Sequence, residues 1–159
     1  MVFTGTYEHT IDSKNRLAIP AEIRSLIPRN LQSKTVCLYA TLGEAKALYL
    51  YTDQGFEQRA EELIKSETDP DSLLGYERIW FSLTRRVELD SAGRIRLPET
   101  LTRRAQLKGE VVLLGNNDHM EIRDRATWCD YIEQVLAEQP QMLMNPRRAI
   151  KRPPPDGGR

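Results

Sequence analysis

Hydrophobic and polar positions alternate near the start of the chain. From residue 3 to residue 11 the odd positions are Phe, Gly, Tyr, His and Ile, whereas the even positions between them are Thr and Glu. This period of two predicts a strand over residues 3–12 with one buried face. Residues 81–90 alternate in the same phase, so we predict an equivalent strand there.

A turn and a short returning strand are predicted after each of these strands. Residues 13–15 read Ser-Lys-Asn and residues 91–93 read Ser-Ala-Gly, and Asn and Gly tolerate the positive φ of a tight reversal. The apolar positions that follow are Leu17, Ile19, Ile95 and Leu97. Because side chains alternate across a strand, Arg16, Arg94 and Arg96 are expected on the polar face.

The pattern then changes to helices. Pro20 and Pro98 suit the first position of a helix, and short helices are predicted over residues 21–26 and 99–104. Longer amphipathic helices are predicted to start near Asp53 and near Asp124. A further helix is predicted from Asp69-Pro70 toward the aromatic pair Trp80-Phe81, because Asp is a good N-cap and Pro a good first residue.

These elements occur twice because the chain contains a repeat. Asp12-Ser-Lys-Asn-Arg16 and Asp90-Ser-Ala-Gly-Arg94 are each followed by a proline four residues later, and the copies are 78 residues apart. The repeat extends to two pairs of segments, residues 36–39 with 111–114 and residues 49–56 with 121–128. We therefore predict two copies of one structural unit.

The repeat suggests an organisation in four parts. These are a first repeat over 1–66, a helical connection over 67–78, a second repeat over 79–138 and a basic tail over 139–159. The tail contains Arg-Arg, Lys-Arg and Pro-Pro-Pro with few apolar residues, so it is predicted to be disordered.

Composition limits the class of protein. A chain of 159 residues with 40% hydrophobic residues can bury a core, and no apolar run approaches the roughly 20 residues that span a bilayer. Since no signal peptide is apparent, a cytoplasmic location is expected. Cys37 and Cys129 are isolated in sequence, so we expect two buried thiols and no metal site.

Charge is balanced overall but unevenly distributed. Residues 1–78 carry 9 basic and 12 acidic side chains, residues 79–138 carry 9 and 10, and residues 139–159 carry 5 and 1. A balanced chain has no long-range field for nucleic acid, so any phosphate binding must come from local patches such as the turns and the tail. With two isolated histidines, no glycine-rich phosphate loop and no metal-ligand spacing, the sequence does not indicate an enzyme or a cofactor. His9 is expected to be packed and His119 to be a loop residue.

The duplicated Asp-Ser-x-x-Arg turn with its proline and the N-terminal Phe-x-Gly-x-Tyr strand resemble the MraZ family. The resemblance covers residues 1 to about 140. It implies an α+β fold of tandem AbrB-like swapped-hairpin β-barrel units with short helices, joined in one compact pseudo-symmetric domain. It also implies a nucleoid-associated, ring-shaped homo-oligomer that binds short tandem direct repeats in double-stranded promoter DNA and represses the division and cell-wall gene cluster.

The resemblance assigns roles to the turn residues. The implied DNA-binding residues are Arg16 and Arg94 first, and then Lys14, Asn15 and Arg96, with Arg24, Arg103 and Arg104 as weaker candidates. Asp12 and Asp90 are expected to shape the turns. Two alternatives stay open: the Asp-Arg pairs could only brace a hairpin, and the chain could be an antitoxin-like or purely structural protein-interaction module.

Overall fold

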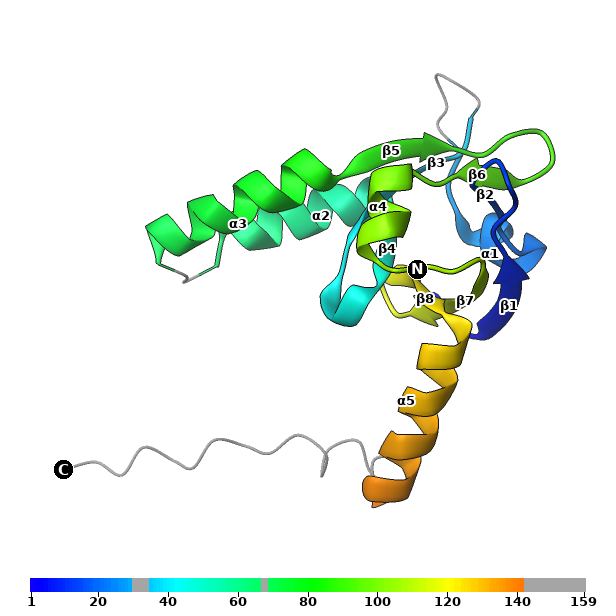
Figure 1. Ribbon diagram of the computed structural model, residues 1–159. Coiled ribbons are helices and arrows are strands. Elements are labelled where there is room, and N and C mark those ends of the chain that lie inside the picture. Colours follow the sequence, from blue (N-terminus) through cyan, green and yellow to red (C-terminus); the bar gives the residue numbers. More distant parts are fainter. Residues whose placement is uncertain (30–34, 67–68, 142–159) are drawn as a thin grey trace. The chain divides into compact units, whose positions relative to one another are not determined.

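The computed structural model describes residues 1–29, 35–66 and 69–141 (Figure 1), a mixed α+β fold with antiparallel sheets. The strands are β1 (Thr6–Thr10), β2 (Arg16–Ala18), β3 (Cys37–Leu42), β4 (Leu48–Thr52), β5 (Arg85–Glu88), β6 (Arg94–Arg96), β7 (Glu110–Asn116) and β8 (His119–Asp124). The helices are α1 (Ala21–Leu26), α2 (Asp53–Ile64), α3 (Pro70–Leu83), α4 (Glu99–Arg104) and α5 (Arg125–Glu138), with a 3₁₀ turn at Glu44–Lys46.

The order of the strands reflects the sequence repeat. One antiparallel sheet has the order β1-β7-β8-β4-β3-β5, and β2 pairs with β6 in a second, two-stranded sheet. If β1, β3 and β4 are exchanged for β5, β7 and β8, the larger sheet keeps the same order. Its two central strands, β4 and β8, come from the two halves of the chain, so the halves share one sheet.

The end strands of the larger sheet lie on the opposite half of the chain. β1 pairs with β7, and β5 pairs with β3. Each half therefore completes the sheet of the other. This exchange explains why residues more than 100 positions apart, such as Thr6 and Leu114, are direct neighbours.

The strand registers correct one part of the sequence alignment. His9 and Val87 are equivalent at the offset of 78 residues, and they pair with Val111 and Leu38 respectively. Leu38 is therefore the structural equivalent of Val111, whereas the sequence comparison matched Val36 to it. The error of two residues leaves the inward and outward alternation unchanged, so the apolar pattern cannot reveal it.

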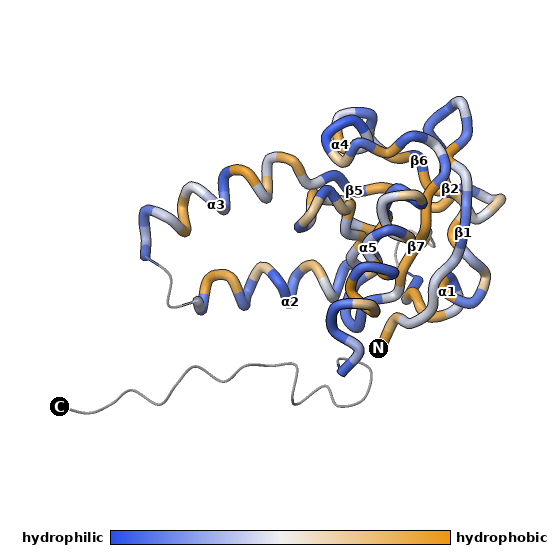
Figure 2. Tube along the Cα trace, turned by 60° about the horizontal axis from the view of Figure 1, so that its bottom comes forward, coloured by the Kyte–Doolittle hydropathy of each residue, from blue (hydrophilic) through white to orange (hydrophobic). Residues whose placement is uncertain are grey.

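The core lies between the two sheets and the short helices. Leu17, Ile19, Ile95 and Leu97 are all buried, as the parity of the returning strands predicts. Figure 2 shows apolar stretches concentrated along the strands. The remaining members of the core include Ile23, Leu38, Leu50, Leu101, Leu113, Met120 and Ile122.

The two short helices form over the predicted residues. Ile23 in α1 and Leu101 in α4 are buried, which ties each helix to the core. Pro20 and Pro98 lie one residue before their predicted place, at the N-cap, and neither cap has a side-chain hydrogen bond. The fixed φ of proline suits this entry as well.

α2 and α3 lie side by side and project from the larger sheet (Figures 1 and 2). As predicted, Asp69 caps α3, where its carboxylate accepts a hydrogen bond from the amide of Ser72 at 3.0 Å. Phe56 of α2 stacks on Trp80 of α3 at 4.9 Å between ring centroids, and also on Tyr39 of β3 at 4.3 Å. These ring contacts fix the helix pair to the sheet.

The prediction of a strand beginning at residue 81 is wrong. Helix α3 continues through Phe81 to Leu83, and β5 begins only at Arg85. The helical conformation is favoured because Trp80 packs on Phe56. The local alternation of apolar and polar residues cannot predict this tertiary contact. In the first copy, Phe3 is buried and makes an isolated bridge to Asn117.

α5 begins at the boundary between two compact units, residues 1–125 and 126–159, the second described as far as residue 141. Within α5, Trp128 contacts Tyr131 with ring centroids 5.6 Å apart. Cys129 is exposed, so its predicted burial is wrong, whereas Cys37 is buried as predicted. Because apolar residues near Cys129 lie on more than one side of the helix, the sequence does not reveal which face Cys129 occupies.

Candidate nucleic-acid interface

The first repeated turn is organised around the carboxylate of Asp12. One oxygen accepts hydrogen bonds from the amides of Lys14 and Arg16, both at 2.9 Å, and the other accepts from Arg16 Nε at 2.7 Å. The amide of Asn15 donates to the carbonyl of Asp12, and Asn15 has a φ of 62°. The predicted turn with positive φ is confirmed at this position.

The second turn repeats the same bonds. Asp90 accepts from the amides of Ala92 at 2.9 Å and Arg94 at 3.0 Å, and from Arg94 Nε at 3.0 Å. Gly93 takes the place of Asn15, with a φ of 73°. The two copies therefore agree in structure although two of the five turn residues differ.

Both carboxylates have lowered pKa values. The backbone amide of Arg16 is the main reason why the pKa of the Asp12 carboxyl lies below its ordinary value, and the Arg16 side chain lowers it further. The amide and side chain of Arg94 lower the pKa of Asp90 in the same way. Both groups are therefore charged at neutral pH, which is the state that accepts these bonds.

The turn arginines retain most of their hydrogen-bonding capacity. Each uses Nε for its ion pair, with side chains 30% exposed for Arg16 and 35% for Arg94. A guanidinium has five N–H donors, and within the described ranges neither side chain has a second hydrogen-bond partner. The ion pair and a further ligand are thus compatible, because bracing occupies only one donor.

The β2–β6 ladder holds the two turns beside each other. Leu17 lies opposite Ile95, and on either side of this pair Arg16 lies opposite Arg96 and Ala18 opposite Arg94. Outside the ladder, the amide of Ile19 donates to Gly93 O at 2.9 Å and the amide of Leu97 to Asn15 O at 2.8 Å. Both turns are therefore positioned by one small sheet.

The remaining candidates differ in their surroundings. The Asn15 amide donates to Leu97 O at 2.8 Å and reaches Thr102 Oγ1 at 3.4 Å, so it already braces the turn. Lys14 and Arg96 are exposed. Asp12 and Asp90 accept the hydrogen bonds that shape the two turns. The role of the five candidate residues in binding DNA stays a prediction.

The weaker candidates also differ in their surroundings. Arg24 on α1 lies against Gly93 of the second turn. Arg103 and Arg104 are exposed in the last turn of α4. Arg85 and Arg86 are not among the predicted site residues, although two adjacent arginines are a visible signal in the sequence; they begin β5.

A second polar cluster lies away from the turns. His119 begins β8 instead of lying in a loop, and its ring is close to those of Tyr49 at 4.4 Å and Tyr51 at 5.2 Å. The imidazole lies 2.7 Å from Asp118 and 3.5 Å from Glu121. Burial opposes the charged ring, but these two carboxylates prevail and raise the pKa of His119.

Glu121 is the buried member of this cluster. Burial alone would raise the pKa of its carboxyl, but His119 and hydrogen bonds from Asn116 and Arg123, both at 2.7 Å, lower it to about 2. With these partners in place, the Glu121 carboxylate is ionised at neutral pH. The described residues contain no group of three or more His, Cys, Asp or Glu that could hold a metal ion.

None of the helices in the described ranges is long and apolar enough to cross a bilayer.

Comparison with known proteins gives one family. A family model described as "MraZ protein, putative antitoxin-like" matches residues 2–74 and again residues 80–151. A protein of Mycoplasmoides gallisepticum named transcriptional regulator MraZ is 37% identical over 123 residues, which is 77% of this chain and 82% of that protein. The proteins of the same name from Ureaplasma parvum and Ureaplasma urealyticum are 31% and 29% identical, each over 90% of this chain and 97% of theirs.

Proposed function

Because the chain belongs to the MraZ family, we propose that it is a sequence-specific DNA-binding transcriptional regulator and that its two repeated turns are the reading surface. The family is one of regulators and not of enzymes, in agreement with the expectation that the chain has no catalytic activity. In finer terms, the target is a set of short tandem direct repeats in the promoter of the division and cell-wall gene cluster, which the protein represses. As part of this proposal, the protein acts in the cytoplasm, on the nucleoid.

One observation carries the proposal. Arg16 and Arg94 have the same backbone and carboxylate bonds, stand on neighbouring turns of the β2–β6 sheet, and each keep N–H donors that no described residue uses. Arginine is the side chain that most often binds guanine edges and phosphates through paired donors. Fixing Nε on an aspartate pre-orients the guanidinium, so less rotamer freedom is lost when DNA binds.

The strand exchange supports the finer description of the fold. Two short hairpins of the same sequence pattern meet in β2 and β6, while β1 and β5 cross to the opposite half. This is the connectivity that a swapped-hairpin unit requires, here with both hairpins in one chain. We therefore assign the tandem AbrB-like swapped-hairpin β-barrel as part of this proposal.

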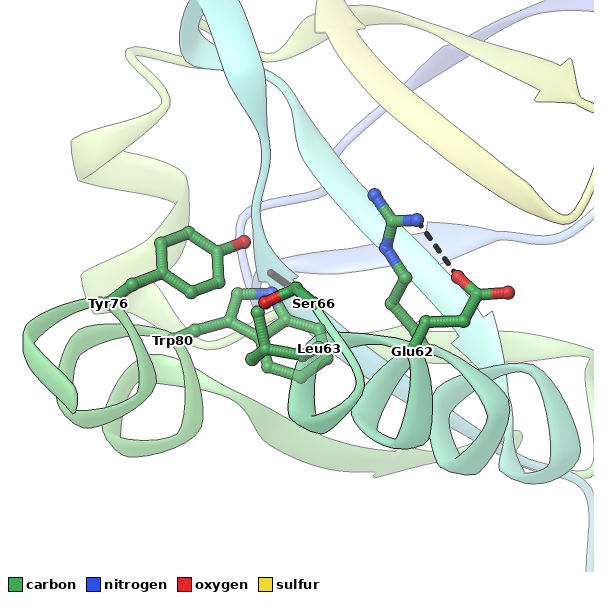
Figure 3. A pocket seen from close by; sticks show the side chains of 6 residues that line it. Glu62, Leu63, Ser66, Tyr76 and Trp80 are labelled. Atoms are coloured by element: carbon green, nitrogen blue, oxygen red, sulfur yellow. Dashed lines mark hydrogen bonds and ion pairs between the residues drawn. The ribbon is translucent and has the colours of Figure 1, made fainter. Parts of the chain in front are cut away.

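Self-association is supported by the helix pair. Apolar side chains are exposed along α2 and α3, at Ile64, Leu74, Tyr76, Ile79 and Phe81. Figure 3 shows a hollow between the helices, where Leu63 faces Tyr76 and Trp80. Large exposed apolar side chains are typical of protein interfaces, and we propose that a second copy of the chain covers those of this helix pair in the ring.

A ring would also compensate for the weak affinity of a single chain for DNA. A contact between one arginine and a base is worth only about 1–3 kcal/mol, so a single chain would bind a short site weakly. Several chains that engage several repeats at once raise the effective concentration and can strengthen binding roughly 10²–10⁴-fold. Tandem sites and a ring of reading turns therefore suit each other.

The test is DNA binding by purified protein. Fluorescence anisotropy with a duplex from the promoter of its own gene, at several salt concentrations, should show tight binding that weakens steeply with salt. A duplex with one repeat should bind far more weakly. Arg16→Ala and Arg94→Ala should abolish specific binding, whereas Lys65→Ala, which removes an exposed charge at the C-terminal end of α2, should not.

Two results would overturn the proposal. If both arginine variants bind the promoter like the wild type, the turns are not the reading surface. If the wild type does not distinguish the promoter duplex from a shuffled one, an antitoxin-like or structural protein becomes the better explanation. Size exclusion on each variant checks that the assembly is intact.

A further inference from the structure

A basic groove lies beside the first turn. It has a volume of about 670 Å³ and is bordered by residues 13–15, the start of β5 and the end of β6. Four cationic side chains line it, Lys14, Arg85, Arg86 and Arg96, against one carboxylate, Glu99. Every one of these five is exposed. The groove therefore carries an excess of positive charge on a chain whose net charge is zero.

The cations in the groove are only partly engaged. Arg85 Nη1 donates to two backbone carbonyls, Ser82 O at 2.7 Å and Thr84 O at 2.9 Å. Arg86 Nη1 pairs with Glu88 at 2.8 Å. Each guanidinium retains other N–H groups, and carbonyl contacts do not neutralise the charge of Arg85.

The equivalent positions in the other half of the chain do not carry these four cations. At the offset of 78 residues, Lys14 and Arg96 correspond to Ala92 and Ala18. Arg85 and Arg86 correspond to Tyr7 and Glu8. The same backbone therefore forms without any of the four cations, so the fold does not require them.

We propose that this basic groove binds the phosphate backbone of duplex DNA next to the first turn, with Arg85 and Arg86 as contacts additional to the turn residues. The inference rests on the proposed DNA-binding function. The exposed side chains provide charge and N–H donors without a fixed bidentate site for a base, which is the chemistry of positioning contacts. Because the equivalent positions of the other half carry none of these four cations, the groove distinguishes the two ends of a pseudo-symmetric reading surface.

The experiment compares salt dependence. Binding of a labelled promoter duplex and of a shuffled duplex of equal length is measured for the wild type and for Arg85→Ala/Arg86→Ala. Loss of two phosphate contacts should reduce the slope of log affinity against log salt by about 1.8 for both duplexes. The preference for the promoter should stay the same, because base contacts are not removed.

Two control variants make the result specific. Arg85→Lys/Arg86→Lys keeps both charges and should keep the wild-type slope. Lys65→Ala/Lys108→Ala removes two exposed charges that do not line the groove, and should also keep it. Thermal melting and size exclusion confirm that each variant is folded and assembled.

The outcomes separate the two proposals. A wild-type protein that does not prefer the promoter duplex overturns the proposed function and this inference with it. A wild type that binds the promoter while Arg85→Ala/Arg86→Ala keeps the full slope overturns the groove alone. Equal losses in the groove variant and the Lys65→Ala/Lys108→Ala variant would show a general effect of net charge, and would overturn the groove as well.

Discussion

The guanidinium of Arg24 fills the space that a side chain at position 93 would need. Gly93 is buried in the second turn, and a Cβ placed on it would meet the Arg24 side chain. In the first turn the equivalent residues are Asn15 and Thr102, which are within reach of a hydrogen bond at 3.4 Å. The two turns thus solve the same packing problem with complementary pairs, Gly with Arg and Asn with Thr.

This relationship predicts a coupled pair of substitutions. Gly93→Asn should destabilise the protein by about 1 kcal/mol, because Arg24 must leave its place. Arg24→Thr/Gly93→Asn should recover most of that loss, since it recreates the pair of the first turn. Chemical denaturation of the two single variants and the double variant measures the coupling. Additive losses would contradict it.

Acid should weaken the turns. The lowered pKa of Asp12 means that its bonds stabilise the folded state above the ordinary aspartate range and are lost as pH falls through the lowered value. Asp12→Ala should therefore melt at a lower temperature than the wild type at pH 7, and the difference should shrink below about pH 4. Thermal melts from pH 3 to pH 7 measure it. A gap that stays constant over this range would show that the carboxylate charge is unimportant.

His119 should produce a second pH dependence with the opposite sign. Because its pKa is raised, the charged ring stabilises the fold fully below about pH 6.5, and this is lost as pH rises through the folded value. The wild type should exceed His119→Gln in melting temperature more at pH 5.5 than at pH 8.5. Titration by NMR should give a midpoint above about 6.5. In Glu121→Gln, which removes one carboxylate, the midpoint should fall.

The exposed helix pair predicts the effect of one surface substitution on assembly. Ile79 is 64% exposed on α3, so Ile79→Glu should leave the fold intact but place a charge in the proposed interface between subunits. The particle mass from light scattering should fall. Ser72→Glu, on an exposed and polar part of α3, is the matched control and should keep the wild-type mass. An unchanged mass for Ile79→Glu would remove this face from the interface.

Local chemistry explains what the sequence alone could predict. The turns follow from an aspartate, a residue that accepts positive φ and apolar parity, all within ten positions. The helices at Ala21–Leu26 and Glu99–Arg104 follow from the same short range. Such features depend on neighbours along the chain, where propensity and periodicity apply.

Long-range contacts explain what the sequence alone could not predict. The alternation of apolar and polar residues does not indicate which strand pairs with which. It therefore could not predict the partners of β1 and β5, or the two-residue shift between the equivalent strands β3 and β7. His119 is enclosed by Tyr49 and Tyr51, about 70 positions away. The groove with Arg85 and Arg86 likewise combines segments from both halves.

The exchange of strands has a consequence for synthesis. β1 leaves the ribosome long before its partner β7, which begins at Glu110. Its backbone donors and acceptors must therefore wait for about a hundred further residues, which at roughly 5–20 residues per second means several seconds. Until then the nascent first half exposes an unpaired strand edge, and the sheet can close only when β7 has been made.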